Sequence, residues 1–142
     1  MTNNKHNRYK TFLILLLLAS VVSCQSGTDQ AAVQSLTSLS QFHLAFIDTY
    51  TRAPNRQWDD AKLHADIDKG ETLFSSATIG ITDQKRAQAL NILHRQFQKD
   101  YTFLQQRAKE GKPCFSVAGA REKKQMLQEN YELAKKGELA RS

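Results

Sequence analysis

The chain has 142 residues, of which 40% are hydrophobic, and its 20 Lys and Arg against 14 Asp and Glu give a formal charge of +6. Three of the basic residues lie in the first ten positions, so 17 basic residues face 14 acidic ones over positions 24–142. No dense patch of Lys and Arg with interleaved aromatic residues occurs in the sequence, which argues against nucleic-acid binding. A chain of this length suits one domain with one core.

The N-terminal segment combines a basic start with an apolar run. Lys5, Arg8 and Lys10 precede a mostly apolar stretch at residues 12–22. A membrane-spanning helix needs roughly 20 apolar residues, whereas the apolar part of a secretory signal peptide has roughly 7–15. The basic residues agree with the tendency of Lys and Arg to stay on the cytoplasmic side. The segment is therefore predicted to be a cleaved signal peptide and not a membrane span.

The apolar run ends in VVSC, residues 21–24. This motif resembles the lipobox of bacterial lipoproteins, in which the Cys thiol receives a diacylglycerol group and the signal is cut immediately before the Cys. The resemblance implies lipidation of Cys24, with acyl chains such as palmitate, and removal of residues 1–23. Gln25 in place of Asp implies sorting to the outer membrane of the cell envelope, with the domain facing the periplasm. The alternative is an ordinary secreted protein that is cut at a conventional site near Cys24.

The remainder of the chain is predicted to be a short tether and one domain. Residues 24–30, which begin with the lipidated Cys24, are small and polar, and residues 31–142 are expected to form the helical domain. Two or more acyl chains hold a protein stably on a bilayer, because each buried methylene contributes ~0.8 kcal/mol. Once Cys24 is lipidated, Cys114 is the only remaining thiol. Cys114 is then either buried or available for an intermolecular disulfide.

Four segments have apolar residues at steps of three and four, the period of an amphipathic helix. The predicted helices cover residues 30–50, 56–77, 83–109 and 120–136. The side chains expected to face inward are Val33, Leu36, Leu39, Phe42, His43, Phe46, Ile47, Tyr50, Trp58, Leu63, Ile67, Gly70, Phe74, Ala77, Ala87, Leu90, Leu93, His94, Phe97, Tyr101, Leu104, Ala108, Met126, Leu127, Tyr131 and Ala134.

The connections between these segments carry signals for helix ends. Asn55 and Thr82 are the expected N-caps of the second and third helices. Pro54 ends the first helix, and Gly111 with Pro113 ends the third. No segment alternates with a period of two for long enough to build a sheet. The predicted fold is therefore all-α, an antiparallel up-and-down bundle of about four helices after the signal peptide.

Two histidines raise the question of a metal site. His43 and His94 lie on the inward stripes of the first and third predicted helices, and bundle cores host metal sites on facing helices. A stable site needs three or four ligands, and no Glu-x-x-His or His-Glu-x-x-His motif is present. Two histidines at helical spacing are more often part of the core, so no metal or cofactor is assigned.

The other reactive groups do not indicate an enzyme. Asp66, Asp68 and Glu71, near His64, are interpreted as a solvated face, because carboxylates two residues apart on a helix point in different directions. Cys114 has no basic neighbour in the sequence to lower the pKa of its thiol. A Ser nucleophile motif and a phosphate-binding Gly loop are absent from the sequence. We therefore predict a protein without catalytic residues.

Three functional interpretations remain open. The first is a non-catalytic protein-interaction module, an accessory or adaptor of an envelope assembly, that holds a partner helix in a groove beside the thinly covered second helix. The second is an inhibitor, immunity or exclusion lipoprotein. The third is a ligand- or metal-binding bundle that uses His43 and His94, with an aromatic interior formed by Phe42, Phe46, Phe97 and Tyr101.

Overall fold

Helices make up most of the chain that the structure describes. The computed structural model describes residues 30–52 and 58–140, and 83% of these residues are helical. The four helices are residues 30–49, called helix 30–49 here, α2 (Asp60–Thr78), α3 (Gln84–Lys109) and α4 (Val117–Leu139). The all-α prediction is confirmed for this part of the chain. The signal peptide and Cys24 lie outside the described residues.

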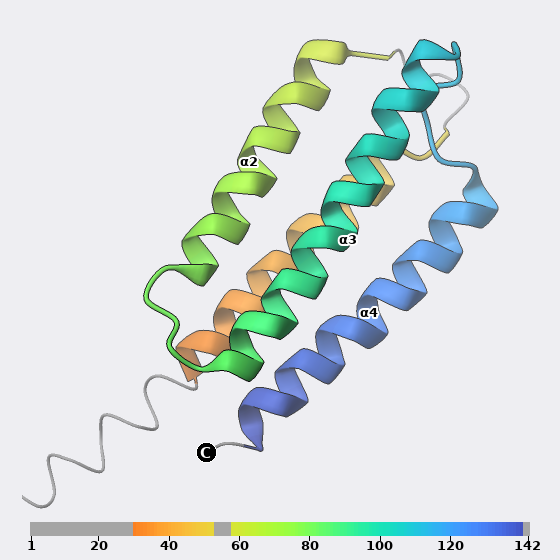
Figure 1. Ribbon diagram of the computed structural model, residues 1–142. Coiled ribbons are helices and arrows are strands. Elements are labelled where there is room, and N and C mark those ends of the chain that lie inside the picture. The colour runs from red at the N-terminus through yellow and green to blue at the C-terminus, as the bar shows by residue number, and fades with distance from the viewer. Residues whose placement is uncertain (1–29, 53–57, 141–142) are drawn as a thin grey trace, which may run out of the picture.

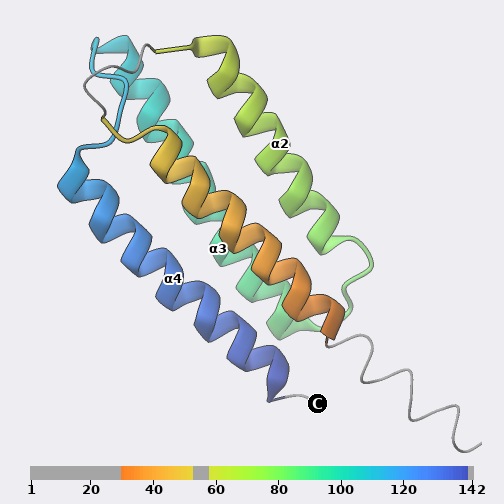
Figure 2. The ribbon, with the colours of Figure 1, turned by 180° about the vertical axis from the view of Figure 1, so that it is seen from behind.

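Successive helices run in opposite directions, as an up-and-down bundle requires (Figures 1 and 2). The start of helix 30–49, the connection between α2 and α3, and the end of α4 lie at one end, called the proximal end here. The connection between α3 and α4 lies at the opposite, distal end. At that end a short parallel bridge joins Thr51 to Phe115, and Arg52 N–H donates to the Phe115 carbonyl at 2.9 Å.

Short polar side chains begin three of the helices, but not all at the predicted positions. Asp59 caps α2 by accepting the Lys62 N–H at 2.9 Å, and Asp83 caps α3 by accepting the Arg86 N–H at 2.7 Å. The predicted cap Thr82 is therefore wrong by one residue. The predicted cap Asn55 lies outside the described residues, and α2 begins later than expected. A carboxylate at Ncap satisfies an N–H that would otherwise have no partner in the first helical turn.

The last helix is longer than the periodicity predicted. Ser116 caps α4 by accepting the Gly119 N–H at 3.0 Å, so the helix begins before residue 120. It also continues past residue 136 to Leu139. Glu138 near its end is 2% exposed and pairs with Arg86 of α3. This ion pair holds the last turn against the bundle, beyond the predicted end of the helix at residue 136.

The core consists of the apolar stripes of all four helices. Two residues predicted to face inward do not: Met126 is 44% exposed, and Ala87 is also exposed. Within the described residues, no helix is both long enough and apolar enough to cross a bilayer. The buried apolar residues are Leu36, Leu39, Phe46, Ile47, Tyr50, Leu63, Ile67, Phe74, Leu90, Leu93, Phe97, Leu104, Phe115, Ala120, Leu127 and Tyr131.

A glycine lets α2 approach α3 closely. A Cβ atom at Gly70 would lie 2.3 Å from Cζ of Phe97 and 2.8 Å from Cε1 of Phe42. The Phe97 ring is fully buried and lies 5.1–5.7 Å from the ring centroids of its aromatic neighbours. The ring therefore occupies the space that a side chain at position 70 would need, which explains a glycine in the middle of a helix.

Candidate functional site

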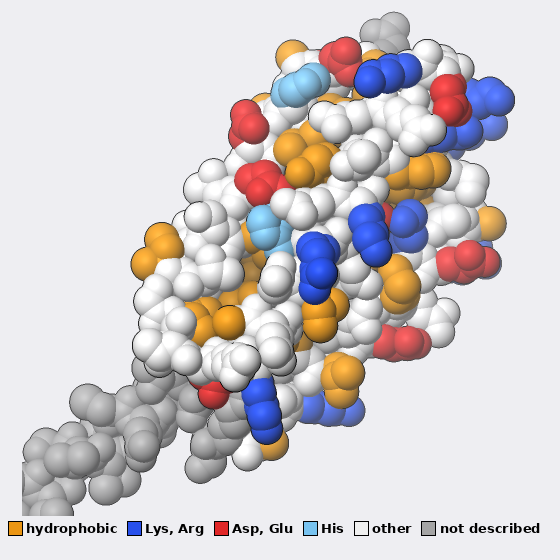
Figure 3. Space-filling view, viewed as in Figure 1, with side chains coloured by type: hydrophobic (Ala, Val, Ile, Leu, Met, Phe, Trp, Pro, Cys, Tyr) orange, Lys and Arg blue, Asp and Glu red, His pale blue; other side chains and the backbone are white. Residues whose placement is uncertain are grey.

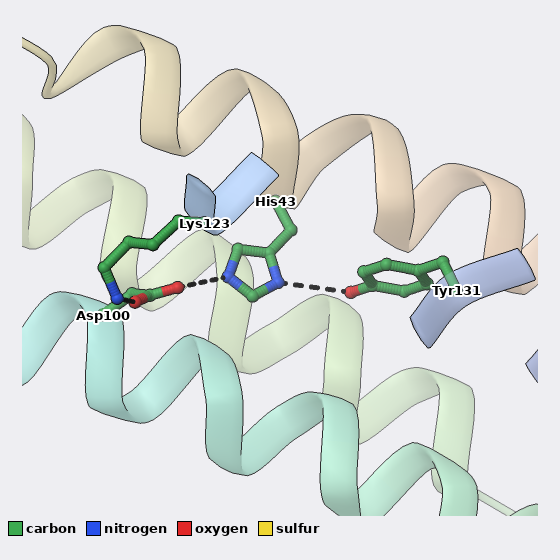
Figure 4. Close-up of polar contacts among 4 residues, drawn as sticks. All are labelled: His43, Asp100, Lys123 and Tyr131. Carbon is green, nitrogen blue, oxygen red and sulfur yellow. Dashed lines mark hydrogen bonds and ion pairs between the residues drawn. The ribbon is translucent and has the colours of Figure 1, made fainter. Parts of the chain in front are cut away.

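Four polar side chains form a network inside the bundle, called the buried polar network here: His43, Asp100, Lys123 and Tyr131. They come from helix 30–49, α3 and α4 (Figure 4). The His43 Nε2 lies 3.0 Å from the Asp100 Oδ2, and the His43 Nδ1 lies 3.4 Å from the Tyr131 hydroxyl. Lys123 Nζ donates to the other oxygen of Asp100 at 2.5 Å. The network thus joins three helices across the core.

The acceptor fixes one proton assignment in the network. A carboxylate only accepts hydrogen bonds, so Nε2 of His43 carries a proton and donates it to Asp100. The Lys123 ammonium balances the negative charge of the Asp100 carboxylate. Burial raises the pKa of Tyr131, which keeps this phenol protonated.

Carboxylate, imidazole and hydroxyl in this order are an arrangement that acid–base catalysts use. In this bundle, however, His43 and Tyr131 are both 0% exposed and Asp100 is 3% exposed. Only Lys123 reaches solvent, with 30% of its side chain exposed. A substrate therefore has no access to the imidazole in this structure. The geometry supports a structural role in which charged and polar groups brace three helices.

The second predicted histidine has a different carboxylate partner. His94 Nε2 lies 2.8 Å from Oε2 of Glu71, and its ring stacks on Phe74 at 4.8 Å. The ring of Phe74 also packs edge-to-face with that of His43, with centroids 6.5 Å apart. The two histidines therefore share an aromatic neighbour, and each pairs with its own carboxylate. No group of three or more His, Cys, Asp or Glu side chains that could hold a metal ion is found among the described residues.

The acidic residues of α2 do not converge on one point. Asp66 accepts hydrogen bonds from Lys62 at 2.5 Å and from the Tyr50 hydroxyl at 2.7 Å. Burial alone raises the pKa of Asp66, but these hydrogen bonds and the Lys62 charge outweigh it, so the pKa is lowered. Asp68 is exposed, and Nδ1 of the exposed His64 donates to a backbone carbonyl at 2.8 Å. These groups stabilise α2 locally and share no pocket.

One buried ion pair had no counterpart in the sequence analysis. Arg86, at the start of α3, donates through Nε at 2.8 Å and through Nη2 at 2.5 Å to the same oxygen of Glu138. Glu138 is almost fully buried at the end of α4. The pair joins the two helices at the proximal end, as the Asp100–Lys123 pair does nearer the distal end.

Cys114 is half-buried and free. It lines a surface hollow of about 490 Å³ with Tyr50 and Trp58, and a second hollow of about 340 Å³ with Arg52 and Lys112. The thiol is thus neither sealed in the core nor fully exposed. An intermolecular disulfide through Cys114 stays a prediction.

The surface between α3 and α4 carries an apolar depression of about 310 Å³, called the α3–α4 groove here. Its walls include Ala89 and Ile92 of α3 and Leu133, Ala134 and Gly137 of α4. Ile92 is 52% exposed and Leu133 is 70% exposed. Figure 3 shows apolar side chains over this part of the molecule, with basic side chains over α3. Exposed apolar side chains that adjoin one another in a contiguous patch are a feature of protein-binding surfaces.

Hollows lie beside α2 as well as between α3 and α4: Ala77 and Ile79 line one of about 390 Å³, and Trp58 and Lys62 line the hollow of about 490 Å³ that Cys114 shares. A thin apolar stripe on the second helix led to the expectation of an uncovered groove beside α2. Four residues of that stripe are buried, Leu63, Ile67, Gly70 and Phe74, whereas Trp58 and Ala77 are half-buried. The small stripe of α2 is sufficient because Gly70 lets the helix sit close to Phe97. A further uncovered apolar surface, the α3–α4 groove, lies on the other side of α3.

No known protein family, no curated protein sequence and no solved structure matches this chain.

Proposed function

We propose that this protein is a non-catalytic interaction module that is anchored to the bacterial cell envelope and binds protein through the α3–α4 groove. The observation that carries the proposal is the exposure of Ile92 and Leu133 on either side of an apolar groove. Large apolar side chains that remain uncovered in a folded domain gain free energy when a partner covers them, at about 25 cal/mol per Å² of apolar surface buried.

The proposal gives the protein no catalytic role, and the positions of its reactive side chains support this. His43 and Tyr131 are fully buried, and Asp100 has two donors on its carboxylate. Arg86 and Glu138 are held in a pair at the proximal end. These groups act on the stability of the bundle, and the groove itself is lined mostly by apolar side chains.

The envelope location is supported by the VVSC motif and by the short distance between Cys24 and the bundle. Helix 30–49 begins six residues after Cys24. Six residues span at most about 20 Å when fully extended. A lipid on Cys24 therefore keeps the proximal end of the bundle close to the bilayer, and the α3–α4 groove lies in that half of the bundle. An outer-membrane location facing the periplasm follows from the sorting signal at Gln25.

Photo-crosslinking in living cells tests the interaction. Benzoylphenylalanine is placed at Ile92 or at Leu133 in the full-length protein, and irradiation should give one reproducible protein adduct from both positions. Gln128 is the control, because it is exposed on α4 but lies five residues from Leu133 and so points to another side of the helix. Equal adducts from all three positions, or none from the groove, would contradict the proposal. An adduct to an incoming toxin or enzyme would favour the inhibitor or immunity interpretation over the adaptor.

A further inference from the structure

We propose that the occupant of the α3–α4 groove is a second copy of this chain, in a two-fold dimer whose axis runs parallel to the helices. In this arrangement α3 of each copy lies on α4 of the other. The inference rests on the proposed function, which makes the groove a protein interface, and it names the partner. The reasons are the distribution of charge on the two walls, their register, and the position of the chain ends.

The exposed charges of the α3 wall are all basic, whereas the α4 wall carries two exposed glutamates and one exposed lysine, Lys136. The exposed charged side chains of α3 are all basic: Lys85, Arg95, Lys99 and Lys109. The only acidic residue of α3, Asp100, is buried in the polar network. On α4, Glu122 and Glu129 are exposed, and helical spacing places both beside the groove-lining stripe that contains Leu133. The space-filling view shows basic side chains over α3 and both acidic and basic ones along α4 (Figure 3).

Some of these charges have no partner of opposite charge within the part of one copy that the structure describes. Neither Arg95 nor Lys99 forms an ion pair there, nor does Glu122, and Glu129 is bonded to the Gln125 amide at 3.1 Å. Where basic Arg95 and Lys99 of α3 stand opposite acidic Glu122 and Glu129 of α4, the face is complementary to itself when it is turned around. A second copy therefore satisfies both walls at once.

The register of the two helices brings specific residues together. Within one copy, the pairs Arg86–Glu138 and Asp100–Lys123 show which positions of α3 and α4 lie at the same height. One residue further along α3 corresponds to one residue back along α4. Arg95 is thus level with Glu129, and Ile92 is level with Glu132, the residue before Leu133. Rotation about an axis parallel to the helices keeps every height, so Arg95 of one copy faces Glu129 of the other across the interface.

The remaining charges of the groove agree with this register. Lys99 is level with residue 125 of α4, which is within one helical turn of Glu122. Lys136 of α4 is level with Gln88 of α3, an uncharged partner. A two-fold axis perpendicular to the helices would instead lay α3 against α3 and bring Arg95 and Lys99 near their own copies. The like charges on α3 disfavour that arrangement.

The position of the chain ends and the size of the face also agree with a dimer whose axis is parallel to the helices. With a parallel axis, both proximal ends lie on the same side, so lipids on both copies of Cys24 reach one membrane. Helices of this length and spacing offer a face of roughly 35 Å by 20 Å, or about 700 Å² per copy. Stable interfaces bury about 800 Å² per partner. We expect a dissociation constant of about 1–10 μM in solution and stronger pairing on a membrane, where anchoring raises the effective concentration.

Sedimentation of the full-length protein, extracted from its membrane in mild detergent, tests the inference at low salt. We expect a dimer that weakens about tenfold or more with Arg95→Glu and equally with Glu129→Arg, because two-fold symmetry changes two contacts per dimer. The double variant, Arg95→Glu with Glu129→Arg, should restore the dimer. Arg121→Glu is the control, since Arg121 is exposed on α4 at a position that helical spacing places away from the groove.

The possible failures separate the partner from the function. A protein that stays monomeric up to about 100 μM, while crosslinks from Leu133 join it to a different protein, overturns the dimer and leaves the interaction module in place. A monomer without any crosslink overturns both. A dimer that resists both charge reversals, or that also weakens with Arg121→Glu, overturns the proposed register.

Discussion

Replacing Asp100 by Ala is expected to lower the free energy of unfolding by about 3–5 kcal/mol, the cost of breaking a buried ion pair by removing one partner. The carboxylate accepts from His43 at 3.0 Å and from Lys123 at 2.5 Å, and it is 3% exposed. Without it, the N–H of the fully buried His43 has no acceptor in the network. Lys123 can turn its ammonium towards solvent, so most of the loss comes from the histidine side.

The chain provides a matched control for this substitution. Asp48 of helix 30–49 also pairs with a lysine of α4, Lys124, at 2.6 Å, but its side chain is 59% exposed. Asp48→Ala should therefore cost about 0–1 kcal/mol. Urea unfolding measures the free energy of unfolding of both variants, with the same dependence on urea concentration applied to each. Equal losses for the two variants would contradict the view that burial of the Asp100 network stabilises the bundle.

Gly70→Ala is expected to destabilise the protein by about 1–3 kcal/mol, although the same change in an exposed helix usually stabilises by up to 1 kcal/mol. The new Cβ would lie 2.3 Å from the Phe97 ring and 2.8 Å from the Phe42 ring. Phe97 is fully buried among other aromatic rings, so it moves only if its neighbours move too. The overlap therefore outweighs the helix propensity that alanine gains.

A second-site change tests that explanation. Phe97→Leu makes room near position 70, so the loss in the double variant Gly70→Ala with Phe97→Leu should be clearly smaller than the sum of the two single losses. Thermal or urea unfolding measures all three variants. A stabilised Gly70→Ala, or strict additivity of the two changes, would show that the close approach of α2 and α3 does not restrict position 70.

The helices could be predicted from the sequence, but several of the contacts between them could not. The 3.6-residue period reveals the four apolar stripes, because each helix must bury one face. The first residue of each helix depends on a single capping contact. Asp83 caps α3, although the adjacent Thr82 is also a suitable capping residue. The stripe of α3 also held a signal that was missed. Asp100 occupies a position between Phe97 and Leu104 where an apolar residue is expected, as Glu138 does in the stripe of α4.

The partners of these buried charges and the uncovered surface depend on how the helices are arranged. Nothing in the local sequence of α3 indicates that Lys123 or His43 will meet Asp100, since the three residues are far apart along the chain. Likewise, the thin stripe of α2 predicted a groove beside that helix, whereas the α3–α4 groove was not predicted. Ile92 and Leu133 lie off the main stripes of their helices, and this displacement was the sequence signal for an apolar surface outside the core.

The envelope-anchored module that we propose depends most directly on Cys24, and one measurement tests this dependence. The intact mass of the protein extracted from membranes is compared with that of the Cys24→Ala variant. The account predicts a chain that begins at Cys24 and carries the mass of its acyl groups, whereas the variant lacks this modification and is lost from the membrane. An unmodified chain, cut elsewhere and recovered in the soluble fraction, would contradict the anchored module and would indicate a freely diffusing secreted protein.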